Sequence, residues 1–156
     1  MLVTIFTPTY NRAYILSKLY VSLCKQTCKD FEWLVVDDGS TDDTKSLCCK
    51  WKEVNYGAKI AIGELFFIVD SDDQLPDDSI SIISEEYNKV RDREDICGIC
   101  GLKAYFSGEK VGGEQTFESF VCNSLDFRYK YHIRGDMAEV FRVKIIREFP
   151  FPEIPN

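Results

Sequence analysis

The sequence predicts an α/β protein with a mostly parallel sheet flanked by helices in a three-layer α/β/α arrangement. Short apolar runs alternate with stretches whose apolar residues recur at helical spacing, as in α/β layer architectures. Two of the apolar runs end directly in acidic clusters, at residues 37–42 and 70–73. The chain has 156 residues, 45% of them hydrophobic, which is enough to bury one core.

The first third of the chain contains two predicted strands and two predicted helices. Residues 3–6 are a short apolar strand, and residues 7–12 are expected to form a polar loop because Pro8 stops the strand. The apolar stripe that follows predicts a helix from Ala13 to near Gln26. Residues 31–36 form the next strand, and Ser40, Thr41 or Asp42 is expected to cap a helix running toward Trp51.

The remaining elements continue the alternation. Residues 58–62 read as a short helix closed by Gly63, and residues 65–69 as a strand that ends in the second acidic cluster. Pro76 and Asp77 begin a helix that continues to Val90. Beyond it we expect a strand at residues 96–106, a glycine-bearing turn at residues 107–113, a turn leading into a strand over residues 135–142 and a short helix at residues 143–148.

The two acidic clusters predict a ligand site. The carboxyl ends of parallel strands lie at one edge of a sheet, so the side chains of Asp37, Asp38, Asp70, Asp72 and Asp73 should share that edge. Mg or Mn sites commonly combine one or two carboxylates with phosphate oxygens, which indicates a metal-diphosphate site. Asp37 and Asp38 could instead serve only a turn and a helix cap; we favour one residue holding the loop and the other facing a ligand.

Composition argues against several other classes. The formal net charge is -7 and no basic stripe is present, so a nucleic-acid surface is not expected. No segment approaches the ~20 apolar residues of a membrane span, and residues 1–6 lack a basic leader and are too short for a signal peptide. The expected location is the cytoplasm, with association at the inner face of the membrane left open.

The seven cysteines are an odd number, and several lie in predicted helices, which does not fit a secreted disulfide framework. Cys97 and Cys100 form a Cys-x-x-Cys pair, but there is no second pair and His132 is the only histidine, so we expect buried structural cysteines. Core packing is also favoured over lining a sugar site for five later aromatic residues: Phe117, Phe120, Phe127, Tyr129 and Tyr131.

Three segments together carry a family resemblance. Thr7 to Arg12, Val35 to Asp42, and Asp70 to Asp73 with Pro76 behind them resemble the inverting glycosyltransferases of family 2. The resemblance covers roughly the first half of the chain and implies the GT-A fold, which is Rossmann-like. It implies a single GT-A-like domain over residues 1–156, with a nucleotide-sugar-binding half at 1–106 and a partial acceptor-side half at 107–156.

The resemblance also implies roles for individual residues. Pro8 and Tyr10 match positions that hold and stack a nucleobase, and Asp38, with Asp37, matches the acid that binds the base. Asp70-Ser71-Asp72 matches the family's Asp-x-Asp motif, in which Asp72 would coordinate Mn or Mg while Asp70 or Asp73 reaches the ribose or the metal through water. The implied donor-binding set comprises Thr7, Pro8, Tyr10, Arg12, Asp37, Asp38, Asp70, Ser71 and Asp72.

The implied reaction moves a sugar, with inversion, from a nucleotide-diphosphate donor, most simply a UDP-sugar, to a saccharide or lipid-linked acceptor in cell-surface polysaccharide synthesis. Two alternatives stay open: a non-catalytic nucleotide-sugar binding module, and a receiver-like phosphoacceptor domain. The chain departs from the family twice. First, the family normally has a further strand between the positions of Asp42 and Asn55; we favour the interpretation that residues are omitted near Val54 and Asn55. Second, no general base can be identified, and Asp136 and Glu139 are only weak acceptor-side candidates.

Overall fold

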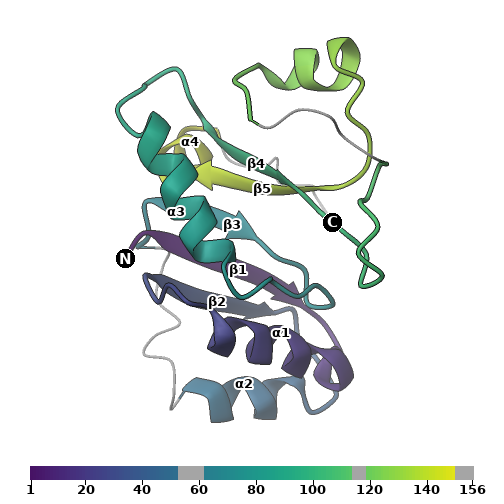
Figure 1. The fold of residues 1–156 in the computed structure, drawn as a ribbon. Helices are drawn as coiled ribbons and strands as arrows, with labels where there is room; N and C mark the ends of the chain where they lie inside the picture. The colour runs from purple at the N-terminus through teal and green to yellow at the C-terminus, as the bar shows by residue number, and fades with distance from the viewer. Residues whose placement is uncertain (53–61, 114–118, 150–156) are drawn as a thin grey trace. The chain divides into compact units, whose positions relative to one another are not determined.

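The structure, a computed structural model, describes residues 1–52, 62–113 and 119–149 (Figure 1). Its elements alternate between strands and helices through the first ninety residues, as the sequence predicts. In chain order they are β1 (Val3–Thr9), α1 (Ala13–Lys25), β2 (Phe31–Asp37), α2 (Thr44–Lys52), β3 (Leu65–Ile68), α3 (Ser79–Val90), β4 (Gly98–Leu102), the π-helical turn η1 (Asp126–Lys130), β5 (Met137–Arg142) and α4 (Val143–Glu148).

The strands form one mixed sheet in the order β2-β1-β3-β5-β4. β1 is parallel to β2 and to β3, whereas β5 is antiparallel to β3. The predicted α/β fold class is therefore confirmed, as a mixed sheet flanked by helices. The position of β1 between β2 and β3 is the feature that matters for the site, because the loops after β2 and β3 flank the loop after β1.

The described chain divides into two compact units. One contains residues 1–99 together with the segment from Glu139 onward, and the other runs from Cys100 to Ala138. The first unit holds β1, β2 and β3 with helices α1 to α4, and the second holds η1. The predicted division into halves at residue 106 stays a prediction.

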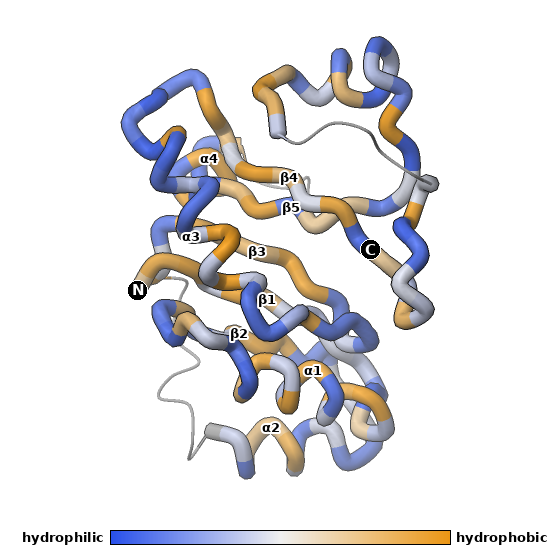
Figure 2. The backbone as a smooth tube through the Cα atoms, in the orientation of Figure 1, coloured by the Kyte–Doolittle hydropathy of each residue, from blue (hydrophilic) through white to orange (hydrophobic). Residues whose placement is uncertain are grey.

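The core of the first unit follows from the apolar stripe of α1. Leu16, Leu19 and Leu23 recur on one face of that helix and are buried against the sheet, where Val3 and Ile5 are fully buried. Figure 2 shows the hydrophobic run of β3 between more hydrophilic segments. Tyr20 stacks on Trp51 with a ring-centroid distance of 4.7 Å, which packs α1 against α2.

The predicted end of the first strand at Phe6 is wrong. β1 continues through Thr9, and Pro8 lies opposite Val36 in the parallel pairing with β2. The other neighbour, β3, pairs with β1 only as far as Phe6, so at Pro8 the strand has a neighbour on one side only. A proline is tolerated there because its missing N–H costs no hydrogen bond on the open side.

Several other predictions are corrected. Cys97 and Cys100 are exposed rather than buried, because β4 is the outermost strand of the sheet. That strand covers Gly98–Leu102 only, shorter than predicted. Among the aromatic residues expected in the core, Phe120, Tyr129 and Tyr131 are exposed and Phe127 is half-buried, while Phe117 lies outside the described residues. The predicted helix at residues 58–62 also lies outside them except for Ile62, which is not helical.

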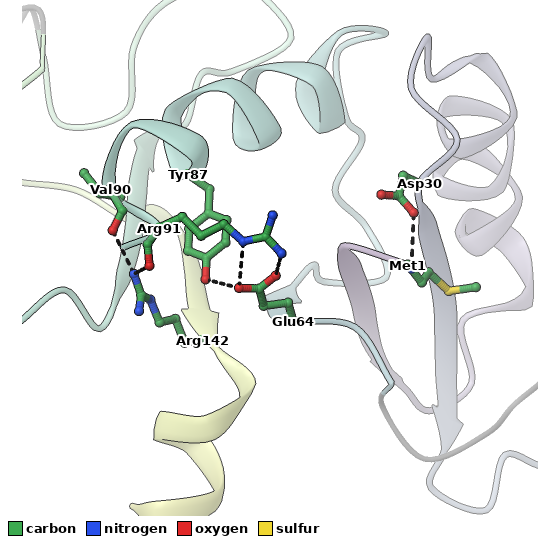
Figure 3. A network of polar contacts seen from close by, with 7 residues as sticks. All are labelled: Met1, Asp30, Glu64, Tyr87, Val90, Arg91 and Arg142. Carbon is green, nitrogen blue, oxygen red and sulfur yellow. Dashed lines mark hydrogen bonds and ion pairs between the residues drawn. The ribbon is translucent and has the colours of Figure 1, made fainter. Parts of the chain in front are cut away.

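A polar network joins α3 to β5 and to the residue before β3, with Tyr87 and Arg142 as its buried members (Figure 3). The Tyr87 hydroxyl donates to Glu64 Oε1 at 2.6 Å, and Arg91 Nη2 donates to Glu64 Oε2 at 2.6 Å. Arg142 is 4% exposed and its Nη2 donates to the carbonyl oxygens of Val90 and Arg91, at the carboxyl end of α3. These bonds pair helix-terminal carbonyls that α3 itself leaves unpaired.

This network predicts a loss of stability in alkaline solution. Burial, and then the Glu64 carboxylate, raise the pKa of Tyr87 to about 12. Because this pKa lies above the ordinary tyrosine value of about 10, the stabilisation is complete below pH ~10 and is lost as the pH rises through ~12. Urea unfolding from pH 8 to 12 should show the wild type losing about 2 kcal/mol more than Tyr87→Phe. Parallel pH profiles for the two proteins would contradict the assignment.

Candidate functional site

Three loops meet at the carboxyl edge of the parallel strands. The first follows β1 at residues 10–12, the second follows β2 at residues 38–43, and the third follows β3 at residues 69–78. The strand ladders continue into two of them, since the N–H of Asp38 donates to the Thr9 carbonyl oxygen at 2.9 Å and that of Val69 to the Phe6 carbonyl oxygen at 3.0 Å. The edge predicted from the sequence therefore exists, and α/β sheets commonly bind ligands at such edges.

Asn11 joins the first loop to the second. Its backbone is in the left-handed region, with φ at 52°, a conformation that asparagine tolerates better than most residues. In this conformation its N–H donates to Ser40 Oγ at 2.8 Å. Its side-chain Oδ1 accepts from the N–H of Thr41 at 2.8 Å and from that of Asp42 at 3.3 Å. Asn11 thus fixes the two loops to one another.

A second set of contacts secures the start of α1. The N–H of Arg12 donates to the buried Thr44 Oγ1 at 3.0 Å, and the N–H of Ala13 donates to Asp42 Oδ2 at 3.1 Å. Asp42 also accepts from the N–H of Thr44 at 3.0 Å. Hydrogen bonds from Thr44 and from the N–H of Ala13 lower the pKa of Asp42. Asp42, expected to cap α2, therefore also provides an acceptor for the first N–H of α1.

Asp37 and Asp38 have different surroundings. Asp37 is half-buried, and its Oδ1 accepts from the N–H of Ser40 at 3.0 Å and from the Ser40 hydroxyl. Asp38 is exposed at the edge of the sheet. Asp37 therefore holds the loop, which both interpretations of this pair allow. The ligand-facing role of Asp38 stays a prediction.

The acidic loop after β3 turns sharply. The N–H of Asp73 donates to the Asp70 carbonyl oxygen at 3.0 Å, as in a β-turn. Ser71 is 5% exposed, whereas Asp70 and Asp72 on either side of it are exposed. Burial of the small serine thus leaves the two predicted donor-binding carboxylates on the solvent side of the turn.

Arg12 couples the first loop to the acidic loop. The pKa of Arg12 is raised above its ordinary value, chiefly by the hydrogen bond that it donates to the Tyr14 hydroxyl at 2.9 Å, and further by the charges of Asp72 and Asp70. The guanidinium therefore lies within electrostatic range of both carboxylates. The predicted combination of a cation and acids at one edge is present.

The carboxylates suit a metal held jointly with a ligand. Within residues 1–52, 62–113 and 119–149, no three His, Cys, Asp or Glu side chains gather closely enough to hold a metal ion by themselves. Mg and Mn sites that bind nucleotides use one or two carboxylates and take the other ligands from phosphate and water. Two exposed carboxylates on one turn, Asp70 and Asp72, fit that requirement.

The other predicted donor residues divide by exposure. Tyr10 is 55% exposed and Pro8 is exposed, so both present surface at the edge of the sheet. Thr7 is fully buried, and its Oγ1 accepts from Trp33 Nε1 at 3.0 Å, which places this side chain in the core beneath the site.

The two acceptor-side candidates lie in different units. Asp136 belongs to the second unit and pairs with Lys103 Nζ at 2.5 Å, which lowers the pKa of its carboxyl group. A carboxylate with a lowered pKa is a weaker proton acceptor, so the pairing disfavours Asp136 as a general base. Glu139 is exposed on β5 in the first unit.

The sequence interpretation missed the residues that hold the loops in place. Asn11 and Ser40 form bonds between loops, and Gln26 is a polar residue that is only 1% exposed. Asn11 carried one usable signal, because asparagine is favoured where the backbone turns into the left-handed region. Gln26 carried another, since a polar side chain at the end of an apolar helical stripe must find internal partners.

The amino-acid sequence of this chain is similar to those of known glycosyltransferases. Residues 4–54, which hold the first two loops, match the family description "Glycosyl transferase family 2". An uncharacterized glycosyltransferase of Rickettsia felis is 37% identical over 97 residues, covering 51% of this chain and 16% of that protein. The similarity to family 2 glycosyltransferases therefore lies in the part of the chain that holds the first two loops.

Solved structures show the same fold. TarS of S. aureus, residues 1–349 in complex with UDP-GlcNAc, superposes with a TM-score of 0.66 at 22% identity, covering 95% of this chain and 47% of that one. The mannosyltransferase PcManGT of Pyrobaculum calidifontis, in complex with GDP-Man and Mn2+, gives 0.63 at 18% identity, covering 96% and 47%. The expected GT-A-like fold is thereby confirmed. The chain spans less than half the length of the Rickettsia felis protein and of each of these two solved chains.

None of the helices within the described ranges is long and apolar enough to cross a membrane.

Proposed function

We propose that the protein containing this chain is an inverting glycosyltransferase, and that the loop edge described above binds its nucleotide-diphosphate sugar donor. The observation that carries the proposal is the convergence of three loops after parallel strands, which brings exposed Tyr10 and Asp38 to the same edge as the acidic turn. The family match and the nucleotide-sugar complexes of two proteins with this fold support it.

In the proposed complex each loop has a separate task. Tyr10 offers an aromatic face to the nucleobase, and Asp38 accepts hydrogen bonds from it. Arg12 faces the anionic part of the donor. The acceptor is a hydroxyl of a saccharide or of a lipid-linked saccharide, and the product belongs to a cell-surface polysaccharide.

Asp70 and Asp72 would hold a divalent cation, Mn or Mg, against the diphosphate. When bound, such a cation neutralises the negative charge that develops on the leaving diphosphate. Asp72 would be the direct ligand, with Asp70 or Asp73 reaching the ribose or the cation through water. The buried Ser71 keeps Asp70 and Asp72 directed outward.

Thermal unfolding with nucleotides tests the donor site. Mn2+ with UDP, at about a hundred times the dissociation constant, should stabilise the wild type by roughly 2.7 kcal/mol, seen as a higher Tm. UDP-GlcNAc and GDP-Man tested in parallel would identify the base. Asp72→Asn should lose the Mn2+-dependent part of the shift.

Asp43→Asn is the matched control, because Asp43 is an exposed acid of the second loop outside the proposed donor set. It should keep the full shift. If no nucleoside diphosphate raises the Tm of the wild type, the proposed donor site is wrong. Transfer measured with the full-length protein separates a transferase from a module that binds donor without using it.

A further inference from the structure

Gln26, the residue directly after α1, has a buried side chain that bonds to a distant part of the chain. It is 1% exposed. Its Nε2 donates to the Pro76 carbonyl oxygen at 2.6 Å and, more weakly, to the Ser22 carbonyl oxygen at 3.3 Å. Its Oε1 accepts from the N–H of Ile80 at 3.1 Å. One amide therefore satisfies both a carbonyl before α3 and an N–H in the first turn of α3.

Neighbours of Gln26 hold the same segment. Ser22 Oγ accepts from the N–H of Leu75 at 3.2 Å. The N–H of Thr27 donates to the Asp77 carbonyl oxygen at 2.8 Å, and the Thr27 hydroxyl lies 3.2 Å from that of Ser81. The carboxyl-terminal end of α1 thus binds residues 75–81 through a row of hydrogen bonds, with Gln26 as its buried centre.

This row fixes the far end of the acidic loop. The near end is fixed by the bond from the N–H of Val69 to the Phe6 carbonyl oxygen. Between these fixed points lie only residues 70–74, which include the acidic turn. A short loop held at both ends samples few conformations, so its carboxylates are already arranged before a ligand binds.

We propose that Gln26 is a positioning residue for the acidic turn, acting through Pro76 and Ile80 and so setting the affinity of the site for a divalent cation with a nucleoside diphosphate. The identity of the ligand rests on the proposed function, whereas the restraint on the loop does not. Without the Gln26 amide, the Ile80 N–H loses its side-chain partner and the Pro76 carbonyl keeps only the bonds from the N–H and hydroxyl of Ser79, so the start of α3 is held less firmly against α1.

Hydrogen exchange measures the restraint without any ligand. Gln26→Met keeps a similar side-chain volume but removes all three hydrogen bonds. Amides of residues 70–75 should exchange about tenfold faster than in the wild type, the effect expected from losing roughly 1.4 kcal/mol of local stability. Amides of β5 serve as the internal reference.

Thr4→Val is the matched control. Thr4 is fully buried near the opposite end of β1; its hydroxyl donates to Glu32 and accepts from the N–H of Gly63 at 3.0 Å. This variant also deletes buried hydrogen bonds, but it should leave exchange in residues 70–75 unchanged relative to β5. Equal exchange of those residues in Gln26→Met and Thr4→Val would overturn the inference. Should Gln26→Met fail to fold, Ser22→Ala tests the same row of bonds through Leu75.

Calorimetric titration of the full-length variants with Mn2+ and UDP completes the test. Gln26→Met should bind about tenfold more weakly than Thr4→Val at equal global stability. Faster exchange with unchanged affinity would show that the restraint exists but does not position the site, and would also overturn the inference. Absence of binding by the wild type contradicts the proposed function instead, so the two failures are distinguishable.

Discussion

Replacing Asn11 with alanine is expected to lower the free energy of unfolding by about 3 kcal/mol. The side-chain oxygen accepts from two backbone N–H groups of the second loop, each bond contributing about 1 kcal/mol. Alanine at φ 52° adds roughly 1 kcal/mol of backbone strain. Urea unfolding measures the total. Because the variant also releases the loop of Tyr10 from the loop of Asp38, the proposed binding of Mn2+ with UDP should weaken by about tenfold or more.

Two further variants separate the causes. Asn11→Asp keeps an acceptor oxygen and a side chain that tolerates the left-handed backbone, so it should retain most of the stability. Asn11→Gly relieves the backbone strain but still lacks the acceptor oxygen, so its stability should lie between those of Asn11→Ala and Asn11→Asp. If Asn11→Ala and Asn11→Asp were equally stable, the hydrogen bonds of Asn11 Oδ1 would not hold the loops together.

Gly98→Ala is expected to be the most damaging small substitution in β4, at about 3 to 4 kcal/mol. A Cβ atom at this position would lie 2.2 Å from the Val140 carbonyl oxygen and 3.0 Å from the Phe141 Cα atom. Both are backbone atoms of β5, and Val140 is itself paired with Phe67 of β3. β5 therefore cannot shift away without breaking a second strand pairing.

Gly101→Ala, in the same strand, is the control for Gly98→Ala. Its Cβ would meet the Ala138 Cβ at 3.7 Å, an ordinary contact, and the substitution should be close to neutral or slightly stabilising. Thermal and urea unfolding of the two variants provide the comparison. Similar losses at both glycines would mean that chain flexibility, and not the contact with Val140, explains the effect.

The fold was largely predictable because the first ninety residues carry strong local signals. The apolar runs before Asp37 and Asp70 and the stripe of α1 are long enough to define their elements. The errors came from tertiary context. Pro8 stays in a strand because it lacks a neighbour on one side, and η1 escaped prediction because a π-helical turn, with the Tyr131 N–H bonded to the Asp126 carbonyl oxygen at 2.9 Å, has no apolar period of its own.

The candidate site was predictable in its charged residues but not in its supports. Acidic residues that follow apolar strands are visible in the sequence as a local pattern. Asn11, Ser40 and Gln26 instead support the site through hydrogen bonds to residues 29 to 54 positions away in the sequence. No local pattern encodes such contacts. The exposure of Cys97 and Cys100 was missed for the same reason, since it follows from the outermost place of β4 in the sheet.

The position of β1 between β2 and β3 sets the distance between the two acidic loops. Neighbouring strands are about 4.8 Å apart, so the acids after β2 and those after β3 are separated by about 10 Å across the sheet. A divalent cation holds its ligands at about 2 Å, so a cation on the carboxylates of the acidic turn would occupy the β3 side of β1. Within the proposed function, a free nucleoside or pyrophosphate reaches one side of β1, and an intact nucleoside diphosphate reaches both. If the proposed function holds, the length of the ligand should therefore contribute to its affinity.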